Sequence, residues 1–118
     1  MPEFIENSKD LKVKQLSELE TVLAGWEDCA PGHFYGPTVR SHELIHFITR
    51  GHGQLTIGGR TFTAAAGDAF LIPAEEMSYY IADQKTPWHY AWIGFTGTHA
   101  ARYMHQLQRA SEGGYILH

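Results

Sequence analysis

The sequence predicts an antiparallel β-barrel or β-sandwich followed by one C-terminal helix. Three observations support this fold class. Short runs rich in β-branched and aromatic residues alternate apolar and polar positions with the period of two that is typical of strands. Glycine-containing turns separate these runs at short intervals. The apolar period changes to spacings of three and four only after Gly97, near the end of the sequence.

The N-terminal part is predicted to contribute an arm and two strands. Residues 1–9 have mixed polarity and no sustained period, so we expect a mobile arm. The run LKVKQ (11–15) alternates apolar and polar residues and is predicted as a short strand. Residues 21–29 are rich in β-branched and aromatic residues and are predicted as a second strand. Residues 30–33 then turn the chain, and Gly36-Pro37 is expected to extend this irregular connection.

Further strands are predicted along the middle of the chain. They cover residues 41–49, 54–57, 60–63, 69–72, 78–82 and 88–95. Gly58-Gly59 is a two-residue hairpin signal between the second and third of them. We expect the last two to pair with each other across a loop that contains Asp83 and Pro87.

A short helix is predicted after Gly97, with Thr98 as the residue that caps its first turn. The residues that follow helical spacings of three and four are Ala101, Met104, His105 and Gln108. Gly113 and Gly114 are expected to end the helix. Because a short amphipathic helix needs a surface to pack on, we expect it to cover the barrel or a partner chain. We also expect the natural polypeptide to continue beyond His118.

Composition and charge exclude several classes of function. At 118 residues the chain fits one domain. Its formal net charge is -4 and its nine Lys and Arg residues are scattered, so we expect no DNA or RNA binding by this stretch itself. No apolar run approaches the roughly 20 residues of a membrane helix, and the N-terminus lacks the pattern of a secretory signal. The single cysteine, Cys29, rules out an internal disulfide, and these features favour the cytoplasm.

A series of motifs runs in fixed order through residues 29–97. They are PGH–x–x–GP–x–VR at 31–40, G–x–G at 51–53, GD–x–FLIP at 67–73, Y–x–AD–x–x–x–PW at 80–88 and Y–x–W–I–x–F–x–G at 90–97. With these motifs the chain resembles the N-terminal effector-binding domain of AraC-type bacterial transcription regulators. The resemblance implies a cupin-like, jelly-roll β-barrel that binds a small molecule, often a sugar, and helices after the barrel that form a homodimer. In that family, C-terminal helix-turn-helix motifs bind DNA, and these 118 residues hold no such part.

The resemblance divides the chain into three parts. Residues 1–20 would form the arm and the first strand, residues 21–97 the effector-binding barrel, and residues 98–118 the start of a helical dimerisation region. In relatives the arm links ligand binding to DNA binding, so Phe4 and Ile5 are expected to fold over the barrel mouth. DNA would be contacted only through the part that is absent from this sequence.

Aromatic residues on the predicted strand 88–95 suggest a carbohydrate site. Trp88, Tyr90 and Trp92 share one face of this strand, and one of its two faces must line the barrel interior. A sugar has apolar C–H faces and a rim of hydroxyls, so its site pairs a flat aromatic ring with a few hydrogen-bonding groups. Aromatic residues at such spacing would serve equally well as core, and we predict that structural role for Trp88.

Resemblance to the arabinose-responsive member of the family favours a binding role for the others. Tyr90 and Trp92 match its sugar-contacting strand, with Trp92 as the stacking surface. Tyr80 matches a contacting tyrosine on the preceding strand, and Arg40 matches an arginine near the mouth. Trp92→Ala is therefore predicted to abolish effector binding while leaving the fold intact.

Four more residues are weaker candidates. His42 and His46 share one face of the predicted strand 41–49, and they could donate to ligand hydroxyls if that face points inward. His33 and Tyr35 lie in the connection before it. The predicted ligand-binding residues are Arg40, His42, His46, Tyr80, Tyr90 and Trp92.

A metal site is the first rival hypothesis, because eight histidines are many for this length. His42 and His46 are four residues apart on one predicted strand, which separates them by about 13 Å, too far for two ligands of one ion. In metal-binding cupins a histidine follows the motif proline by five residues. Counted from Pro73 that place holds Ser78. We therefore expect no metal and no cofactor.

Catalysis is the second rival, and the sequence offers no constellation for it. Glu75 and Glu76 are neighbours whose side chains point to opposite sides, so they cannot act as an acid/base pair and are predicted to lie in a solvated turn. Cys29 shows no sign of activation and is predicted as a small core residue. We predict that the chain is not an enzyme. The alternatives are a metal-dependent cupin enzyme, such as a sugar isomerase or an oxygenase, and a free-standing carbohydrate-binding module.

Overall fold

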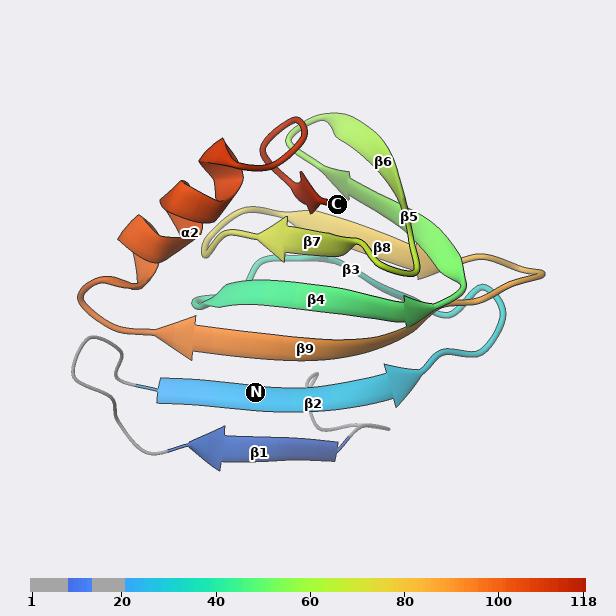
Figure 1. Ribbon diagram of the computed structural model, residues 1–118, viewed down its shortest axis with the longest axis horizontal. Coiled ribbons are helices and arrows are strands. Elements are labelled where there is room, and N and C mark those ends of the chain that lie inside the picture. Colours follow the sequence, from blue (N-terminus) through green and yellow to red (C-terminus); the bar gives the residue numbers. More distant parts are fainter. Residues whose placement is uncertain (1–8, 14–20) are drawn as a thin grey trace.

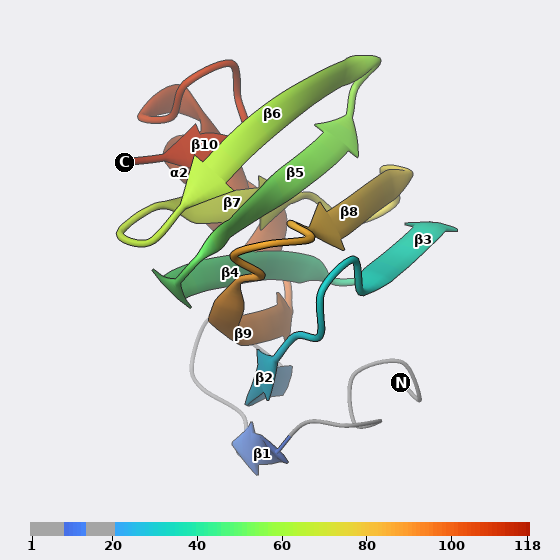
Figure 2. The same ribbon diagram turned by 90° about the vertical axis from the view of Figure 1, so that its right-hand side faces the viewer.

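The computed structural model describes residues 9–13 and 21–118, which form two antiparallel β-sheets with one helix outside them (Figure 1). The first sheet has the strand order β1 (Lys9–Val13), β2 (Thr21–Asp28), β9 (His89–Thr96), β4 (Glu43–Arg50), β7 (Ala69–Ile72) and β10 (Ile116–Leu117). The second has the order β3 (Phe34–Thr38), β8 (Ser78–Ala82), β5 (His52–Ile57) and β6 (Arg60–Ala65). The sheets face each other (Figure 2), and buried side chains from both fill the space between them. The predicted fold class is confirmed.

Alternation along each strand decides which side chains enter the barrel. On β9, Tyr90 and Trp92 are buried in the main core, whereas Ala91 and Ile93 are half-buried on the other face. Trp88, one residue before the strand, is 1% exposed and joins the same core. The prediction that Trp88, Tyr90 and Trp92 share one face is confirmed, and that face is the interior one.

Helix α2 (Ala100–Arg109) covers the outer face of the six-stranded sheet (Figure 1). Its buried side chains, Ala100 and Met104, pack with Leu71 and Phe95 in a second apolar cluster. Of the two surfaces expected for the helix, the barrel or a partner chain, the structure shows that it packs on the barrel. Of the residues predicted to follow the helical spacing, however, Met104 alone is buried.

The ends of the helix differ from the prediction. Thr98 is not the N-cap; His99 takes that place without a side-chain hydrogen bond, because the first helical hydrogen bond ends on the His99 carbonyl. The helix stops at Arg109, before the glycine pair. Gly113 and Gly114, with φ of 63° and 91°, instead turn the chain into β10, which pairs with β7. Two residues are too few to show a strand period, so the sequence does not predict β10.

The expected pairing of β8 with β9 is wrong. β8 lies between β3 and β5, whereas β9 lies between β2 and β4 in the other sheet. The loop between them crosses from one sheet to the other, and a period of two does not show which sheet a strand joins. β3 is a further difference, since it occupies the stretch around Gly36-Pro37 that was expected to be irregular. An edge strand tolerates proline, and the pairing of β3 with β8 shifts register between Tyr35 and Thr38.

The N-terminal predictions are tested only in part. Strand β1 matches the predicted first strand but begins and ends two residues earlier than 11–15. The predicted arm, with Phe4 and Ile5, lies outside the described residues except for Lys9. Within the described ranges, no helix has the length and apolar character needed to cross a membrane.

Candidate functional site

The residues predicted to bind a ligand all lie inside the barrel. Each is at most 6% exposed, and they are Arg40, His42, His46, Tyr80, Tyr90 and Trp92. Strands β4 and β9 place His46 directly opposite Trp92. From the facing sheet, β8 brings the ring of Tyr80 to 5.0 Å from the ring of His46. Three strands and the loop before β4 thus bring these side chains together.

His46 lies at the centre of this group. Its ring stacks on Phe70 with 4.4 Å between centroids and 7° between planes. The ring of Tyr90 meets it edge-on at 4.7 Å. Burial, with a smaller effect from Arg40, holds the pKa of His46 well below its ordinary value. His46 is therefore neutral at physiological pH.

Arg40 and His42 approach from the loop before β4. The Arg40 guanidinium donates to the hydroxyl of Tyr80 over 3.5 Å, and the Arg40 carbonyl accepts a 2.7 Å hydrogen bond from the amide of Glu75. His42 lies against Gly94, where an added Cβ would be 2.9 Å from the imidazole Cδ2. Glycine at this position makes room for the ring. Burial, with Arg40 as a second cause, lowers the pKa of His42 to about 4.

Glu27 is a buried carboxylate that sequence reasoning missed. It is 6% exposed on β2, and its Oε1 accepts hydrogen bonds from the hydroxyls of Tyr35 at 3.0 Å and Tyr90 at 3.4 Å. His33 Nε2 lies 3.3 Å from Oε2. Burial raises the pKa of Tyr35, and the neighbouring Glu27 carboxylate adds to this effect. The only sequence signal is that Glu27 shares strand parity with Cys29, which is also buried.

Burial keeps most of the ionisable side chains around His46 uncharged. Burial raises the pKa of the Tyr80 and Tyr90 hydroxyls, and it raises the pKa of the Cys29 thiol to about 12. Cys29 is 5% exposed in the main core, as predicted. The buried side chains around His46 also include one basic residue, Arg40, and one acidic residue, Glu27. In residues 9–13 and 21–118, no three His, Cys, Asp or Glu side chains lie close enough together to hold a metal ion.

Nδ1 of His46 and Oγ of Ser78 are among the buried polar atoms that have no hydrogen-bond partner within the described part of the chain. Each of the two residues is 1% exposed. Ser78 shares the inward face of β8 with Tyr80. We define the interior cluster as Glu27, Tyr35, Arg40, His42, His46, Ser78, Tyr80, Tyr90 and Trp92. Buried polar groups without partners are rare in folded proteins. His46 lies beside the rings of Phe70, Tyr80 and Tyr90.

Acidification is expected to destabilise the protein through His42 and His46. In the unfolded chain both imidazoles take up protons near pH 6.5, whereas the folded chain keeps His42 neutral until the pH approaches about 4. The unfolded state then binds more protons, so the free energy of unfolding falls with pH by up to about 1.4 kcal/mol per pH unit for each histidine. Urea unfolding between pH 7 and pH 4 measures this slope. His46→Phe removes one of the two groups, so the slope should fall by up to about 1.4 kcal/mol per pH unit. An unchanged slope would contradict the burial of a neutral His46.

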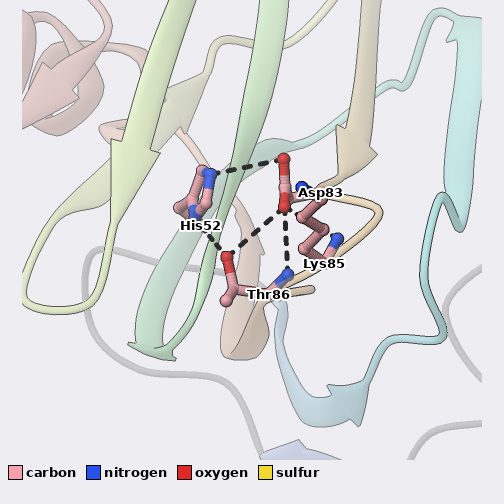
Figure 3. A network of polar contacts seen from close by, with 4 residues as sticks. All are labelled: His52, Asp83, Lys85 and Thr86. Atoms are coloured by element: carbon pink, nitrogen blue, oxygen red, sulfur yellow. Dashed lines mark hydrogen bonds and ion pairs between the residues drawn. The ribbon is translucent and has the colours of Figure 1, made fainter.

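A separate polar network fastens the loop between β8 and β9 (Figure 3). The amides of Thr86 and Lys85 donate to Asp83 at 3.0 and 2.9 Å and lower the pKa of its carboxyl. His52 Nδ1 lies 2.7 Å from the Thr86 hydroxyl, and its Nε2 lies 3.3 Å from Asp83. A histidine between a hydroxyl and a carboxylate has the residue types of a nucleophilic triad. Thr86 also donates directly to Asp83 at 3.4 Å, however, so the network holds the loop on β5.

Two hollows lie beside the four-stranded sheet. The larger, of about 460 Å³, lies between the β5–β6 turn at Gly58 and Gly59 and residues 76–79. The smaller, of about 300 Å³, lies at the opposite end of β5 and β8, near His52. The larger hollow shares Ser78 with the interior cluster.

Solved cupin structures share this fold. A cupin 2 conserved barrel domain protein from Salinispora arenicola has a TM-score of 0.57, with 14% identity, over 82% of this chain and 82% of its own. A mutant of Bacillus subtilis oxalate decarboxylase has a TM-score of 0.61, with 17% identity, over 86% of this chain and 29% of its own. At these identities the likeness establishes the fold alone, and it confirms the cupin-like barrel.

Operon regulators resemble the chain in sequence. The Msm operon regulatory protein of Streptococcus mutans is 42% identical over 104 residues, which are 88% of this chain. The raffinose operon transcriptional regulatory protein of Pediococcus pentosaceus is 37% identical over 67% of this chain. The lactose operon transcription activator of Staphylococcus xylosus is 30% identical over 77%. The chain spans about a third of the length of these relatives, with 34%, 29% and 33% of them matched.

The family model of the AraC-like ligand binding domain matches residues 20–116. This range begins one residue before β2 and ends inside β10, so it includes both sheets beyond β1 as well as helix α2. It also contains every motif on which the resemblance was based, and that resemblance is confirmed. The chain belongs to the family of AraC-like ligand binding domains.

Proposed function

We propose that the interior cluster binds a small neutral sugar, and that the chain is the effector-sensing part of an AraC-type transcription regulator. The observation that carries this proposal is the pair of buried, unpartnered atoms His46 Nδ1 and Ser78 Oγ. A buried polar group without a partner costs about 1–3 kcal/mol, and a ligand hydroxyl would remove that cost. Trp92, opposite His46, would supply the flat apolar surface that a sugar ring needs.

Charge in the interior cluster suits a neutral polyol. Arg40 is a donor and Glu27 an acceptor, so a ligand with hydroxyls at several positions can use both. An anionic ligand would be attracted by Arg40 but repelled by the buried Glu27 carboxylate. The family membership and the names of the raffinose and lactose operon regulators support a saccharide as the class of effector.

The remaining functions are proposed for a longer regulator of the relatives' kind, since this chain spans about a third of their length. We propose that DNA is bound by a separate domain, that residues 98–118 contribute to a homodimer, and that effector binding shifts the regulator between two states. The regulator relatives support a non-enzymatic role. One tightly bound transition metal per purified chain would instead favour a cupin enzyme. A stop codon directly after His118 would favour a free-standing carbohydrate-binding module.

Calorimetric titration with galactose, glucose, lactose, maltotriose and raffinose tests the proposed function. At least one of these sugars is expected to bind, and at 100 times its dissociation constant it should stabilise the fold by about 2.7 kcal/mol. Absence of both heat and thermal stabilisation with every sugar would overturn the proposal.

Ser78→Ala is expected to change stability and binding in opposite directions. It removes a buried hydroxyl that has no partner in the described residues, so the free energy of unfolding should stay unchanged or rise by up to about 1 kcal/mol. Loss of one hydrogen bond to the ligand should weaken sugar binding by about tenfold. Urea unfolding and calorimetry measure the two effects. Reduced stability with unchanged affinity would show that Ser78 supports the fold and does not contact the ligand.

A further inference from the structure

We propose that the 460 Å³ hollow is a second sugar subsite, so that the effector is an oligosaccharide whose first ring lies in the barrel and whose next ring lies in the hollow. This inference rests on the proposed function, because it assumes that the interior cluster holds a sugar. It adds the length of the ligand and a separate set of residues that recognise it.

Position supports this subsite. Ile57 is the last residue of β5 and Ser78 is the first of β8, and the two are paired across the sheet. Both line the hollow, while their side chains belong to the buried inner face. Ile57 and Ser78 are therefore the last pair between β5 and β8, and the hollow lies at this end of the two strands. We infer that a chain of linked sugar rings that contacts Ser78 from inside would continue over this last pair into the hollow.

The lining of the hollow also suits a sugar ring. Tyr79 offers a half-buried aromatic ring, and Met77, which is 62% exposed, offers apolar surface beside it. Thr56 adds a hydroxyl and Glu76 a carboxylate. Glu76 is held in place by the Tyr115 hydroxyl, which donates to its Oε1 at 2.7 Å. It is half-buried at the end of the turn that begins at Pro73, where a turn was predicted. The volume falls within the roughly 300–1,000 Å³ of small-molecule sites.

The β5–β6 turn keeps the hollow open to solvent. Gly58 and Gly59 line the hollow without side chains, and an added Cβ on Gly59 would meet no atom within 4 Å. Both residues have positive φ, of 60° and 75°, which side-chain-bearing residues rarely adopt. The turn type that this hairpin needs thus also keeps bulky groups away from the subsite.

Calorimetry with matched sugars tests the subsite. The unaltered protein is expected to bind lactose, maltotriose or raffinose at least tenfold more tightly than galactose or glucose. Tyr79→Ala should weaken oligosaccharide binding by about tenfold and leave the monosaccharide affinity unchanged. Phe34→Ala is the matched control: Phe34 is 56% exposed beside Tyr79, with 5.8 Å between ring centroids, but it does not line the hollow. All affinities should be unchanged in that variant.

The possible failures are distinguishable. If no sugar binds at all, the proposed function fails and the subsite fails with it. If monosaccharides and oligosaccharides bind equally, or if Tyr79→Ala weakens both to the same extent, only the subsite is overturned. If Tyr79→Ala leaves every affinity unchanged but alters the oligomeric state in sedimentation, the hollow belongs to a protein interface and the subsite is again overturned.

Discussion

Trp92→Ala is expected to abolish effector binding in titrations with any sugar that binds the unaltered protein. The substitution removes the flat surface of the interior cluster and leaves a cavity beside His46, its cross-strand partner. Because Trp92 is 3% exposed in the main core, the free energy of unfolding should also fall by about 3–5 kcal/mol. The sequence alone predicts an intact fold after this change, and the burial of Trp92 adds the loss of stability.

Trp92→Phe is the matched control, because it keeps an aromatic face and leaves a smaller cavity. We expect it to remain folded at 25 °C and to bind the same sugar more weakly, by about tenfold. Thermal unfolding followed by circular dichroism establishes that each variant is folded before titration. Unchanged affinity in a folded Trp92→Ala variant would rule out Trp92 as the stacking surface.

Gly51→Ala is expected to lower the free energy of unfolding by about 3 kcal/mol or more, whereas Gly59→Ala should cost only about 1 kcal/mol. The two glycines have nearly the same φ, 71° and 75°, so alanine meets the same backbone strain at both. Their surroundings differ. A Cβ on Gly51 would fall against the carbonyl group of Pro87, 2.6 Å from its carbon, but on Gly59 it would meet nothing within 4 Å.

The difference between these two variants isolates one close contact, between the β4–β5 turn and the loop before β9. The backbone carbonyl of Pro87 cannot rotate away as a side chain can, so relief of the clash must move the loop that positions Trp88. Urea unfolding of both variants provides the comparison. Equal losses of stability would show that the turn and the loop are not in close contact.

Patterns along single strands could be predicted from the sequence, and relations between strands could not. Alternation placed Trp88, Tyr90 and Trp92 on one face, and the structure confirms this. The same alternation does not show which sheet each strand joins, and the predicted pairing of β8 with β9 was therefore wrong. Strand partners are decided by contacts between residues far apart in sequence, which local periodicity does not contain.

Buried polar residues were the other part of the candidate site that periodicity could not supply. The sequence alone predicts that the Glu27 side chain is exposed to solvent, since acidic residues are rarely buried without partners. Its partners, Tyr35 and Tyr90, come from opposite sheets, so the burial becomes evident only once both sheets are in place. Arg40 and Tyr80 were placed in the site by resemblance to the family, and their binding role stays a prediction.

The two faces of β9 pack in different parts of the molecule, and residues along the strand alternate between them. Tyr90 and Trp92 face the interior cluster, whereas Ile93 and Phe95 pack in the cluster under helix α2. Under the proposed function, effector preference would change by replacement of inward residues one at a time, without disturbing the surface that holds the helix. Insertion or loss of a single residue within the strand would exchange the two sets together. During evolution, substitutions on the inward face of β9 are therefore tolerated more readily than a change in the number of its residues.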